Sequence, residues 1–153
     1  MPRVSDSSTG FTLIELMLVV SLGIVVAAVA LPNLLTVNRT YRLSTASATV
    51  SAKVHQARVN ALKQNRQAWV RVDGAAGTVQ VQVAGPGGGA IDVGGAEYLP
   101  QGVTFGTGNA VVLVTFDAMG RPLNPPQSIQ VLYPGSGLTR TITVTSTGRV
   151  TTG

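Results

Sequence analysis

The chain contains no cysteine, a single histidine, and few charged or aromatic residues for its length of 153. The absence of cysteine excludes disulfides and thiolate metal sites, so a folded domain must hold together by packing and strand pairing alone. Charged residues make up 11% of the chain, and only six are Asp or Glu. Glycine is abundant at 18 residues, which is typical of a β-rich domain with many turns.

The groups that could serve an enzyme are scattered along the sequence. His55 has no acid or nucleophile near it and lies off the apolar side of a predicted helix, so we expect it to be exposed. The glycine-rich stretch 85–89 lacks the Lys-Ser/Thr of a phosphate-binding loop. We expect a protein that is not an enzyme, with no catalytic residue, no metal site and no cofactor. The later acids fall in turns, loops or strand ends without metal-ligand spacing, Asp92 with Glu97 being the weak exception: Asp73, Asp92, Glu97 and Asp117.

A long apolar run follows a mostly polar leader of residues 1–10. The run extends from Phe11 to Leu31 and contains one charge, Glu15. As a helix it would be roughly 31 Å long, which matches the hydrocarbon core of a bilayer. A carboxylate within such a helix is costly to bury, which makes Glu15 a candidate functional residue. The alternative is a carboxyl near the membrane interface that is simply hydrated or protonated.

The charges that flank this run do not decide its orientation. Arg3 and the amino terminus precede it together with Asp6, whereas Arg39 and Arg42 follow it. The positive-inside bias therefore does not clearly place the N-terminus in the cytoplasm.

Residues 10–16, Gly-Phe-Thr-Leu-Ile-Glu-Leu, resemble the prepilin signal of the type IV pilin and pseudopilin superfamily. The resemblance implies that a prepilin peptidase cuts after Gly10 on the cytoplasmic side and that Phe11 becomes an N-methylated N-terminus. It also implies that Glu15 pairs with the ammonium of a neighbouring subunit during filament assembly. The chain would then be a single-pass protein of the inner membrane, with its N-terminus inside and its C-terminal domain extracytoplasmic, before it enters a filament with other pilin subunits. An ordinary membrane anchor with a stray glutamate is the alternative.

The helix is expected to continue beyond the apolar run. Pro32 should either bend it flexibly or mark the boundary between its membrane and soluble parts. Residues 33–69 contain no glycine or proline, and small apolar side chains recur there at helical spacing. We therefore predict an amphipathic helix over about 33–68, within one extracytoplasmic domain of residues 32–153. The predicted buried stripe comprises Leu43, Ala46, Val50, Val54, Ala57, Ala61 and Ala68.

The remainder, about 69–153, is predicted to form a β-sheet. Alternating segments separated by Gly, Pro and Asn indicate antiparallel strands, and residues 84–95 are expected to be a flexible loop. A long N-terminal helix followed by such a sheet is an α+β arrangement, pilin-like if the resemblance holds. The predicted strands are 78–83, 103–105, 110–116, 128–133, 138–145 and a short one near 149–151.

Two later segments extend the resemblance. Residues 114–122 and 142–150 both contain a Gly-Arg pair after a strand, and they look like the two signatures of the FimT/GspH branch of minor pilins and H-type pseudopilins. The implied function is that of a structural subunit of a type IV pilus or of a type II secretion pseudopilus. The sequence alone does not choose between these systems.

A DNA-binding minor pilin for DNA uptake is the alternative function. The net charge of +5 and the pI near 10.5 favour an anionic partner, with Arg149, Arg121 and Arg140 as candidate contacts. Some relatives carry a C-terminal Gly-Arg-x-Arg motif, which here lacks its second arginine at Thr151. The cations of the predicted helix, Lys53 among them, point in different directions, as expected of side chains that solvate a surface. DNA binding is therefore possible but not favoured.

Overall fold

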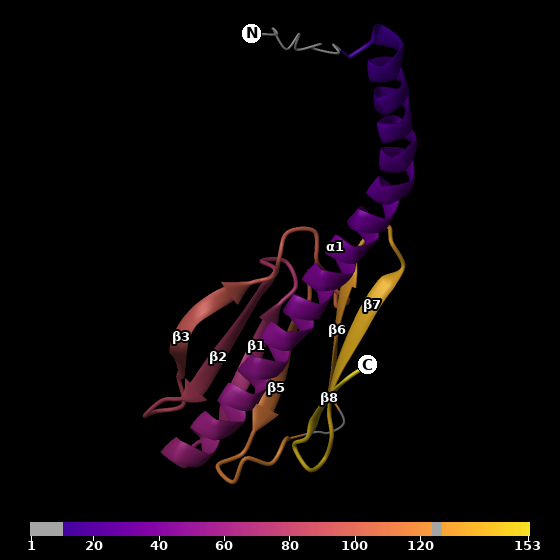
Figure 1. Ribbon diagram of the computed structural model, residues 1–153. Coiled ribbons are helices and arrows are strands. Elements are labelled where there is room, and N and C mark those ends of the chain that lie inside the picture. Colours follow the sequence, from indigo (N-terminus) through magenta and orange to yellow (C-terminus); the bar gives the residue numbers. More distant parts are fainter. Residues whose placement is uncertain (1–10, 124–126) are drawn as a thin grey trace, which may run out of the picture. The chain divides into compact units, whose positions relative to one another are not determined.

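The computed structural model describes residues 11–123 and 127–153, in which one long helix is followed by eight strands (Figure 1). The leader with Gly10, and the side chain of Pro32, lie outside the described residues. This order of elements confirms the predicted α+β class. The elements are α1 Leu13–Gln64, β1 Ala68–Asp73, β2 Thr78–Ala84, β3 Ala90–Tyr98, β4 Thr104–Phe105, β5 Val111–Phe116, β6 Gln127–Tyr133, β7 Leu138–Val144 and β8 Val150–Thr152.

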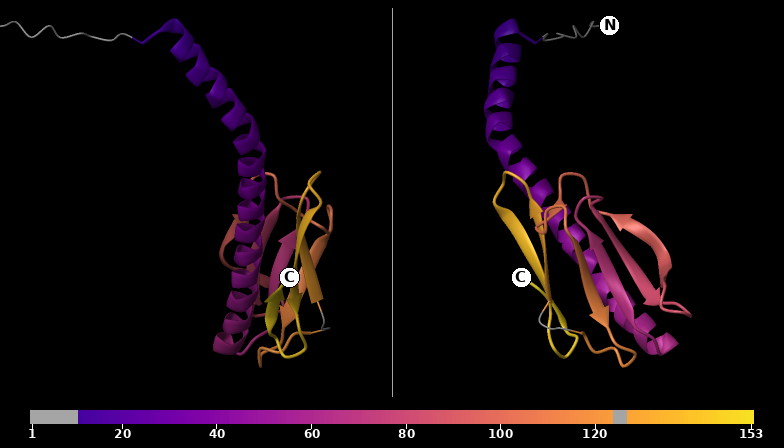
Figure 2. Two further views of the ribbon diagram at one scale, coloured as in Figure 1. Left: turned by 45° about the vertical axis from the view of Figure 1, so that its right-hand side comes forward. Right: turned by 180° about the vertical axis from the view of Figure 1, so that it is seen from behind.

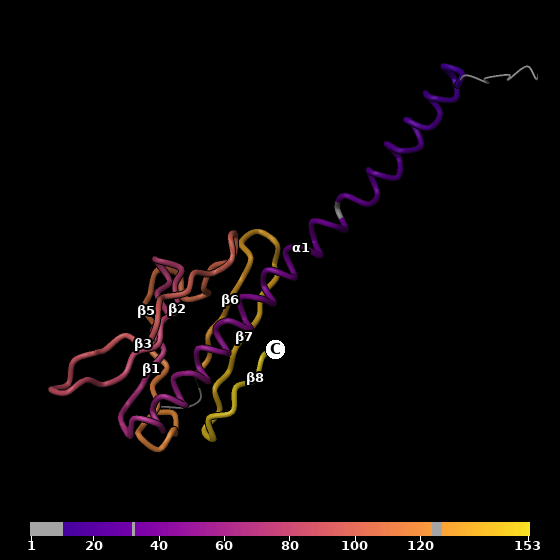
Figure 3. The backbone as a smooth tube through the Cα atoms, turned by 60° about the vertical axis from the view of Figure 1, so that its left-hand side comes forward, coloured from indigo at the N-terminus to yellow at the C-terminus, as the bar shows by residue number. Residues whose placement is uncertain are grey.

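The chain divides into two compact units, one ending at Asn38 and the other spanning Arg39–Gly153. The backbone of α1 is helical throughout and takes part in both units (Figure 3). Within the first unit, every described side chain from Phe11 onward is exposed. The buried core therefore lies entirely in the second unit, where the first buried residue is Leu43.

The helix α1 ends at Gln64, about four residues before the predicted end. Asn65 has a φ of 49° and so adopts the left-handed conformation that commonly ends a helix. The Arg66 amide then donates to the Ala61 carbonyl at 3.2 Å, which satisfies one of the carbonyls that the last turn leaves without a partner. Asparagine takes this conformation more readily than most residues, and no glycine is needed here.

The strands form two antiparallel sheets of four, ordered β3-β2-β1-β5 and β4-β6-β7-β8. The part of α1 from Arg39 on lies against one side of both sheets (Figure 2). Residues of the inner strands alternate between this side and solvent, as the burial of β2 shows, and the inward positions are mostly valine. Strand β3, at the edge of its sheet, is almost wholly exposed. All seven residues of the predicted stripe are buried, although Ala68 belongs to β1 and not to the helix.

The chain after α1 differs from the prediction in two places, by one strand that was not predicted and by one loop that is a strand. Residues 68–73 form β1, a strand between β2 and β5 that is absent from the predicted strands. Residues 90–95, expected to be part of a flexible loop, belong to β3, which pairs with β2 through a register shift between Val79 and Val81. Pairing overrides the low strand propensity of glycine here, and the side chain of Gln82 donates to that of Asp92 at 2.7 Å across the two strands.

Candidate functional site

The first turn of α1 is capped by Thr12. The backbone amide of Glu15 donates to Thr12 Oγ1 at 3.3 Å, and α1 begins at the next residue, Leu13. Thr12-x-x-Glu15 has the spacing of a capping box, in which a threonine and a glutamate satisfy the free amides at a helix start. Thr12 was not among the residues predicted from the sequence, although Thr-x-x-Glu before an apolar run indicates a helix start.

Glu15 lies in this same first turn, four residues after Phe11. A negative charge is favourable there because the free amides make the start of a helix electropositive. The side chains of both residues are exposed, Phe11 by 80%. The two ion pairs found in the described part of the chain lie elsewhere, between Lys53 and Glu97 and between Arg71 and Asp73.

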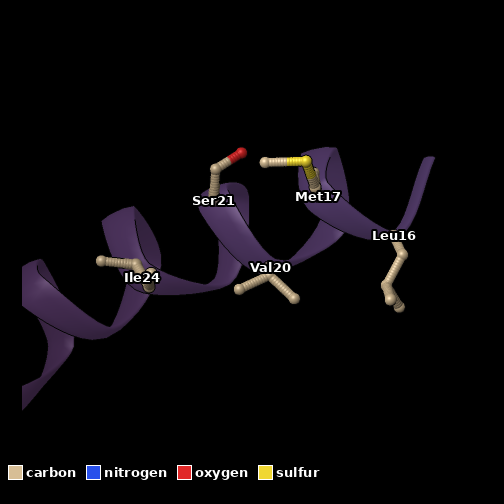
Figure 4. A pocket seen from close by; sticks show the side chains of 5 residues that line it. All are labelled: Leu16, Met17, Val20, Ser21 and Ile24. Atoms are coloured by element: carbon tan, nitrogen blue, oxygen red, sulfur yellow. The ribbon is translucent and has the colours of Figure 1, made fainter. Parts of the chain in front are cut away.

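The helix that follows presents apolar side chains on all sides. Leu16, Met17, Val20, Ser21 and Ile24 line a shallow depression on its surface (Figure 4). The Ser21 hydroxyl donates to the Leu18 carbonyl at 2.9 Å, so even this polar group is satisfied within the helix. By length and composition α1 could cross a membrane. An exposed helix of this kind is stable only when lipid or other apolar helices cover it.

The two Gly-Arg segments form the same turn. In one, the Gly120 amide donates to the Asp117 carbonyl at 2.9 Å and the Arg121 amide donates to Asp117 Oδ1 at 2.7 Å. In the other, the Gly148 amide donates to the Thr145 carbonyl at 2.8 Å and the Arg149 amide to the Thr145 hydroxyl at 3.2 Å. Both glycines have positive φ, 70° and 75°. This is a three-residue hairpin loop that requires glycine at its third position.

Both turns are seated on neighbouring turns of α1. A Cβ added to Gly120 would lie 3.0 Å from Leu62 Cγ, and one added to Gly148 would lie 3.0 Å from Arg58 Cζ. Arg58 Nη1 also donates to the Gly148 carbonyl at 2.9 Å. Since Arg58 and Leu62 are four residues apart, they lie on one side of the helix. The exposed Arg121 and Arg149 therefore follow turns at the same end of the domain, near the C-terminal end of α1 (Figure 1).

Arg140 does not join these two arginines. It lies in β7 opposite Val131, on the side of the sheet that faces α1, and is half-buried. Five residues of extended strand separate it from Thr145, which corresponds to about 16 Å. The three candidate DNA contacts thus divide into a pair, Arg121 with Arg149, and a separate Arg140.

Other predicted residues have local structural environments. Lys53 is only 8% exposed, contrary to the expectation that the helical cations solvate a surface, and its ammonium pairs with Glu97 at 3.0 Å. Asp92 instead receives the bond from Gln82, so the two acids of β3 have different partners. His55 is exposed, as predicted. Across residues 11–123 and 127–153, no group of three or more His, Asp or Glu could hold a metal ion.

Comparisons with known proteins agree with the resemblance seen in the sequence. Residues 6–31 match the family described as the prokaryotic N-terminal methylation motif. The fold is similar to that of the minor pseudopilin EpsH from the type 2 secretion system of Vibrio cholerae, with a TM-score of 0.60 and 12% identity over 73% of this chain and 96% of that one.

It is also similar to the type IV minor pilin FimU of Pseudomonas aeruginosa, with a TM-score of 0.57 and 18% identity over 74% of this chain and 90% of that one. No curated protein matches the chain significantly by sequence. The resemblance to the type IV pilin and pseudopilin superfamily is therefore confirmed in the N-terminal motif and in the fold.

Proposed function

We propose that this protein is a minor pilin or pseudopilin, a non-enzymatic subunit of a type IV pilus or of a type II secretion filament. The observation that carries the proposal is the methylation motif of residues 6–31 at the start of an apolar helix whose described side chains are exposed through Asn38. The two similar solved structures, a minor pseudopilin and a minor pilin, support it at the level of the fold. They come from different machines, so both remain within the proposal.

The proposed mechanism is assembly through α1. The apolar helix holds the subunit in the inner membrane, with the N-terminus inside and the folded domain outside the cytoplasm. A prepilin peptidase cleaves after Gly10, and the new Phe11 amine is methylated. Helices of other pilin subunits then replace lipid around α1, so that its apolar surface stays covered throughout. Pro32 would give the helix local freedom during this transfer.

Glu15 is the residue proposed to order the subunits along the filament. A carboxylate and an ammonium within an apolar bundle each cost several kcal/mol when unpaired, so each strongly favours the register that brings them together. The carboxylate of one subunit would therefore meet the Phe11 ammonium of a neighbour. The exposed position of Glu15 in the first turn of α1 is compatible with this pairing.

The decisive experiment is the intact mass of the protein produced with and without a prepilin peptidase. We expect the peptidase to remove Met1–Gly10 and the mature chain to carry one added methyl group. Gly10→Val is the matched control and should keep the full mass in the presence of the peptidase. A wild-type chain that remains uncleaved would overturn the proposal and leave an ordinary membrane-anchored β-domain.

DNA binding is a second candidate function because Arg121 and Arg149 follow turns seated side by side on α1. Filter binding to duplex DNA over a salt series would test it, since neutralised phosphates make affinity fall steeply with salt. Binding that falls with salt and is weakened by the double variant Arg121→Gln/Arg149→Gln would support it. No salt-dependent affinity even at low salt would eliminate it.

A further inference from the structure

Two arginines follow the apolar run in a place where the proposed topology does not call for them. Arg39 comes two residues after Val37, the last apolar residue of the exposed part of α1, and Arg42 lies one helical turn further on. Cations are usually concentrated at the cytoplasmic end of a membrane helix, whereas these lie at the opposite end. Membrane topology therefore does not explain the position of these two arginines, and contacts within the folded domain must be considered.

The domain holds both side chains. The Arg39 guanidinium lies over the ring of Tyr133, with 5.6 Å from Cζ to the ring centroid. Arg42 Nη1 donates to the carbonyl of Gln101 at 2.8 Å. The first contact reaches β6 and the second reaches the loop after β3, so two separate parts of the sheet region order these cations at one end of the domain.

Arg140 extends this group. Tyr133 lies opposite Leu138 in the pairing of β6 with β7, and Arg140 is two residues further along β7, on the same side of the sheet. This spacing corresponds to roughly 7 Å. In the described part of the chain, neither Arg39 nor Arg140 forms an ion pair with a carboxylate. These residues together form the basic end of the domain, which comprises Arg39, Arg42, Tyr133 and Arg140.

We propose that the basic end binds the phosphate groups of anionic phospholipids in the outer leaflet of the inner membrane. Guanidinium groups bind phosphate in a bidentate manner, and an aromatic ring beside them suits the headgroup region of a bilayer. The inference rests on the proposed membrane anchoring, since Arg39 follows the apolar segment directly in the sequence and would therefore lie close to the bilayer surface. Lipid contact would hold the domain against the membrane until the subunit enters a filament.

The charge distribution favours lipid over a protein partner at this end. Between Glu15 and its end at Gln64, α1 contains no Asp or Glu, so its cations are not interspersed with carboxylates. A protein surface that carries both signs of charge would therefore be complemented less well than a uniformly anionic lipid surface. Each arginine close to an anionic surface favours the bound state by about fivefold. The contribution should weaken with salt, as for other interactions at a charged surface.

The test uses the full-length chain in vesicles of phosphatidylcholine alone or mixed with phosphatidylglycerol. Because the chain has no cysteine, Gln101→Cys provides a single fluorophore site at the basic end, where the side chain is exposed. Quenching by lipids with spin-labelled headgroups reports how often this end touches the membrane. We expect stronger quenching with phosphatidylglycerol, and a decrease of about fivefold in the docked-to-undocked ratio for each of Arg39→Gln and Arg140→Gln.

A charge-matched control is available at the other end of the domain. Arg121→Gln/Arg149→Gln removes the same charge as Arg39→Gln/Arg140→Gln but should leave quenching unchanged, and a fluorophore at Ser146→Cys should not respond to phosphatidylglycerol. Arg39→Lys/Arg140→Lys keeps the charge but not the bidentate geometry, so its response should lie between those of the wild type and Arg39→Gln/Arg140→Gln, which separates loss of charge from misfolding.

Four results would overturn the inference. Equal quenching in both kinds of vesicle would exclude a site that prefers anionic headgroups. An unchanged response in Arg39→Gln/Arg140→Gln would exclude these arginines as the site. A fluorescence change on adding inorganic phosphate to phosphatidylcholine vesicles, abolished by that double variant, would indicate a site for free anions instead. A chain that alkaline carbonate extracts from the vesicles would contradict the anchoring itself, and with it the proposed function, whereas the other three results leave that function intact.

Discussion

At the scale of single residues, Glu15 combines a structural role at the start of α1 with a proposed role between subunits. Its backbone amide is bonded to Thr12, and its carboxylate lies where the start of α1 favours negative charge. Both effects stabilise the helix within one subunit. The proposed pairing with the ammonium of a neighbour acts between subunits, so the two roles can be separated by substitutions that keep one and remove the other.

Glu15→Gln and Glu15→Leu make this separation. Glutamine can still act in a capping box although it has no charge, whereas leucine can neither act in a capping box nor carry a charge. We expect both variants to be lost from sheared filaments, as measured by immunoblotting of the filament fraction. Thr12→Val is the complementary control: it should destabilise the helix start by about 1 kcal/mol and yet permit incorporation. Wild-type incorporation of Glu15→Gln would show that helix capping, and not charge pairing, is the contribution of this residue.

At the scale of elements, the two Gly-Arg turns fasten the two sheets to the helix. The turn that contains Gly120 follows β5 of the first sheet, and the turn that contains Gly148 joins β7 to β8 of the second. One sits on Leu62 and the other on Arg58. The glycines of both signatures are thus explained by their positive φ and by their close approach to side chains of α1, while the arginines that follow them remain exposed.

Gly120→Ala should destabilise the domain more than Gly135→Ala does. Both residues have positive φ, so each substitution strains the backbone by about 1–2 kcal/mol. Only at Gly120 does the new methyl group also press on Leu62, since nothing lies within 4 Å of a Cβ at Gly135. Denaturant unfolding in detergent would measure the difference. Gly120→Ala/Leu62→Ala should remove the additional destabilisation that the contact with Leu62 causes. Equal losses of stability in Gly120→Ala and Gly135→Ala would show that the turn at Gly120 is not tightly packed against α1.

The sequence predicts elements well where one local pattern dominates. The stripe of α1 and strands β2, β6 and β7 follow from periodicity, because their inward and outward positions differ in polarity. Strand β5 is apolar on both faces and follows instead from a short run of β-branched and aromatic residues between turns. Strand β1 was not predicted because no glycine or proline precedes Trp69, so the helical pattern has no visible end there. The helix α1 in fact ends before Asn65, which adopts the left-handed conformation. Strand β3 depends on pairing with β2, which a glycine-rich stretch does not reveal locally. The burial of Lys53 likewise depends on Glu97, a partner distant in sequence.

At the scale of the whole molecule, the two units have separate physical requirements. Every buried hydrophobic residue of the described chain lies at Leu43 or beyond, so the domain of residues 39–153 contains its complete core. The preceding part of α1 has only exposed side chains and needs an apolar environment. The solubility of the chain is therefore governed by one unit and the stability of its fold by the other.

Deleting residues 1–38 should consequently give a soluble domain that retains its fold. We expect a monomer by size-exclusion chromatography and a single cooperative thermal transition followed by circular dichroism, as for other small domains. Reducing agent should not shift this transition because the chain contains no cysteine. A broad, non-cooperative transition would show that the first unit contributes to the fold of the second.

The cap of α1 has a consequence for the chain end that cleavage would create. Thr12 and Glu15 both lie beyond the Gly10–Phe11 bond, so hydrolysis there would remove neither partner of the bond that starts the helix. It would, however, place an ammonium one residue before the cap, beside the electropositive start of α1, where a positive charge is repelled. Processing would thus leave the helix intact, but the new ammonium of Phe11 would be repelled by the start of α1. A carboxylate from another chain would offset that repulsion, so pairing with a neighbouring subunit would lower the free energy of each newly cleaved subunit.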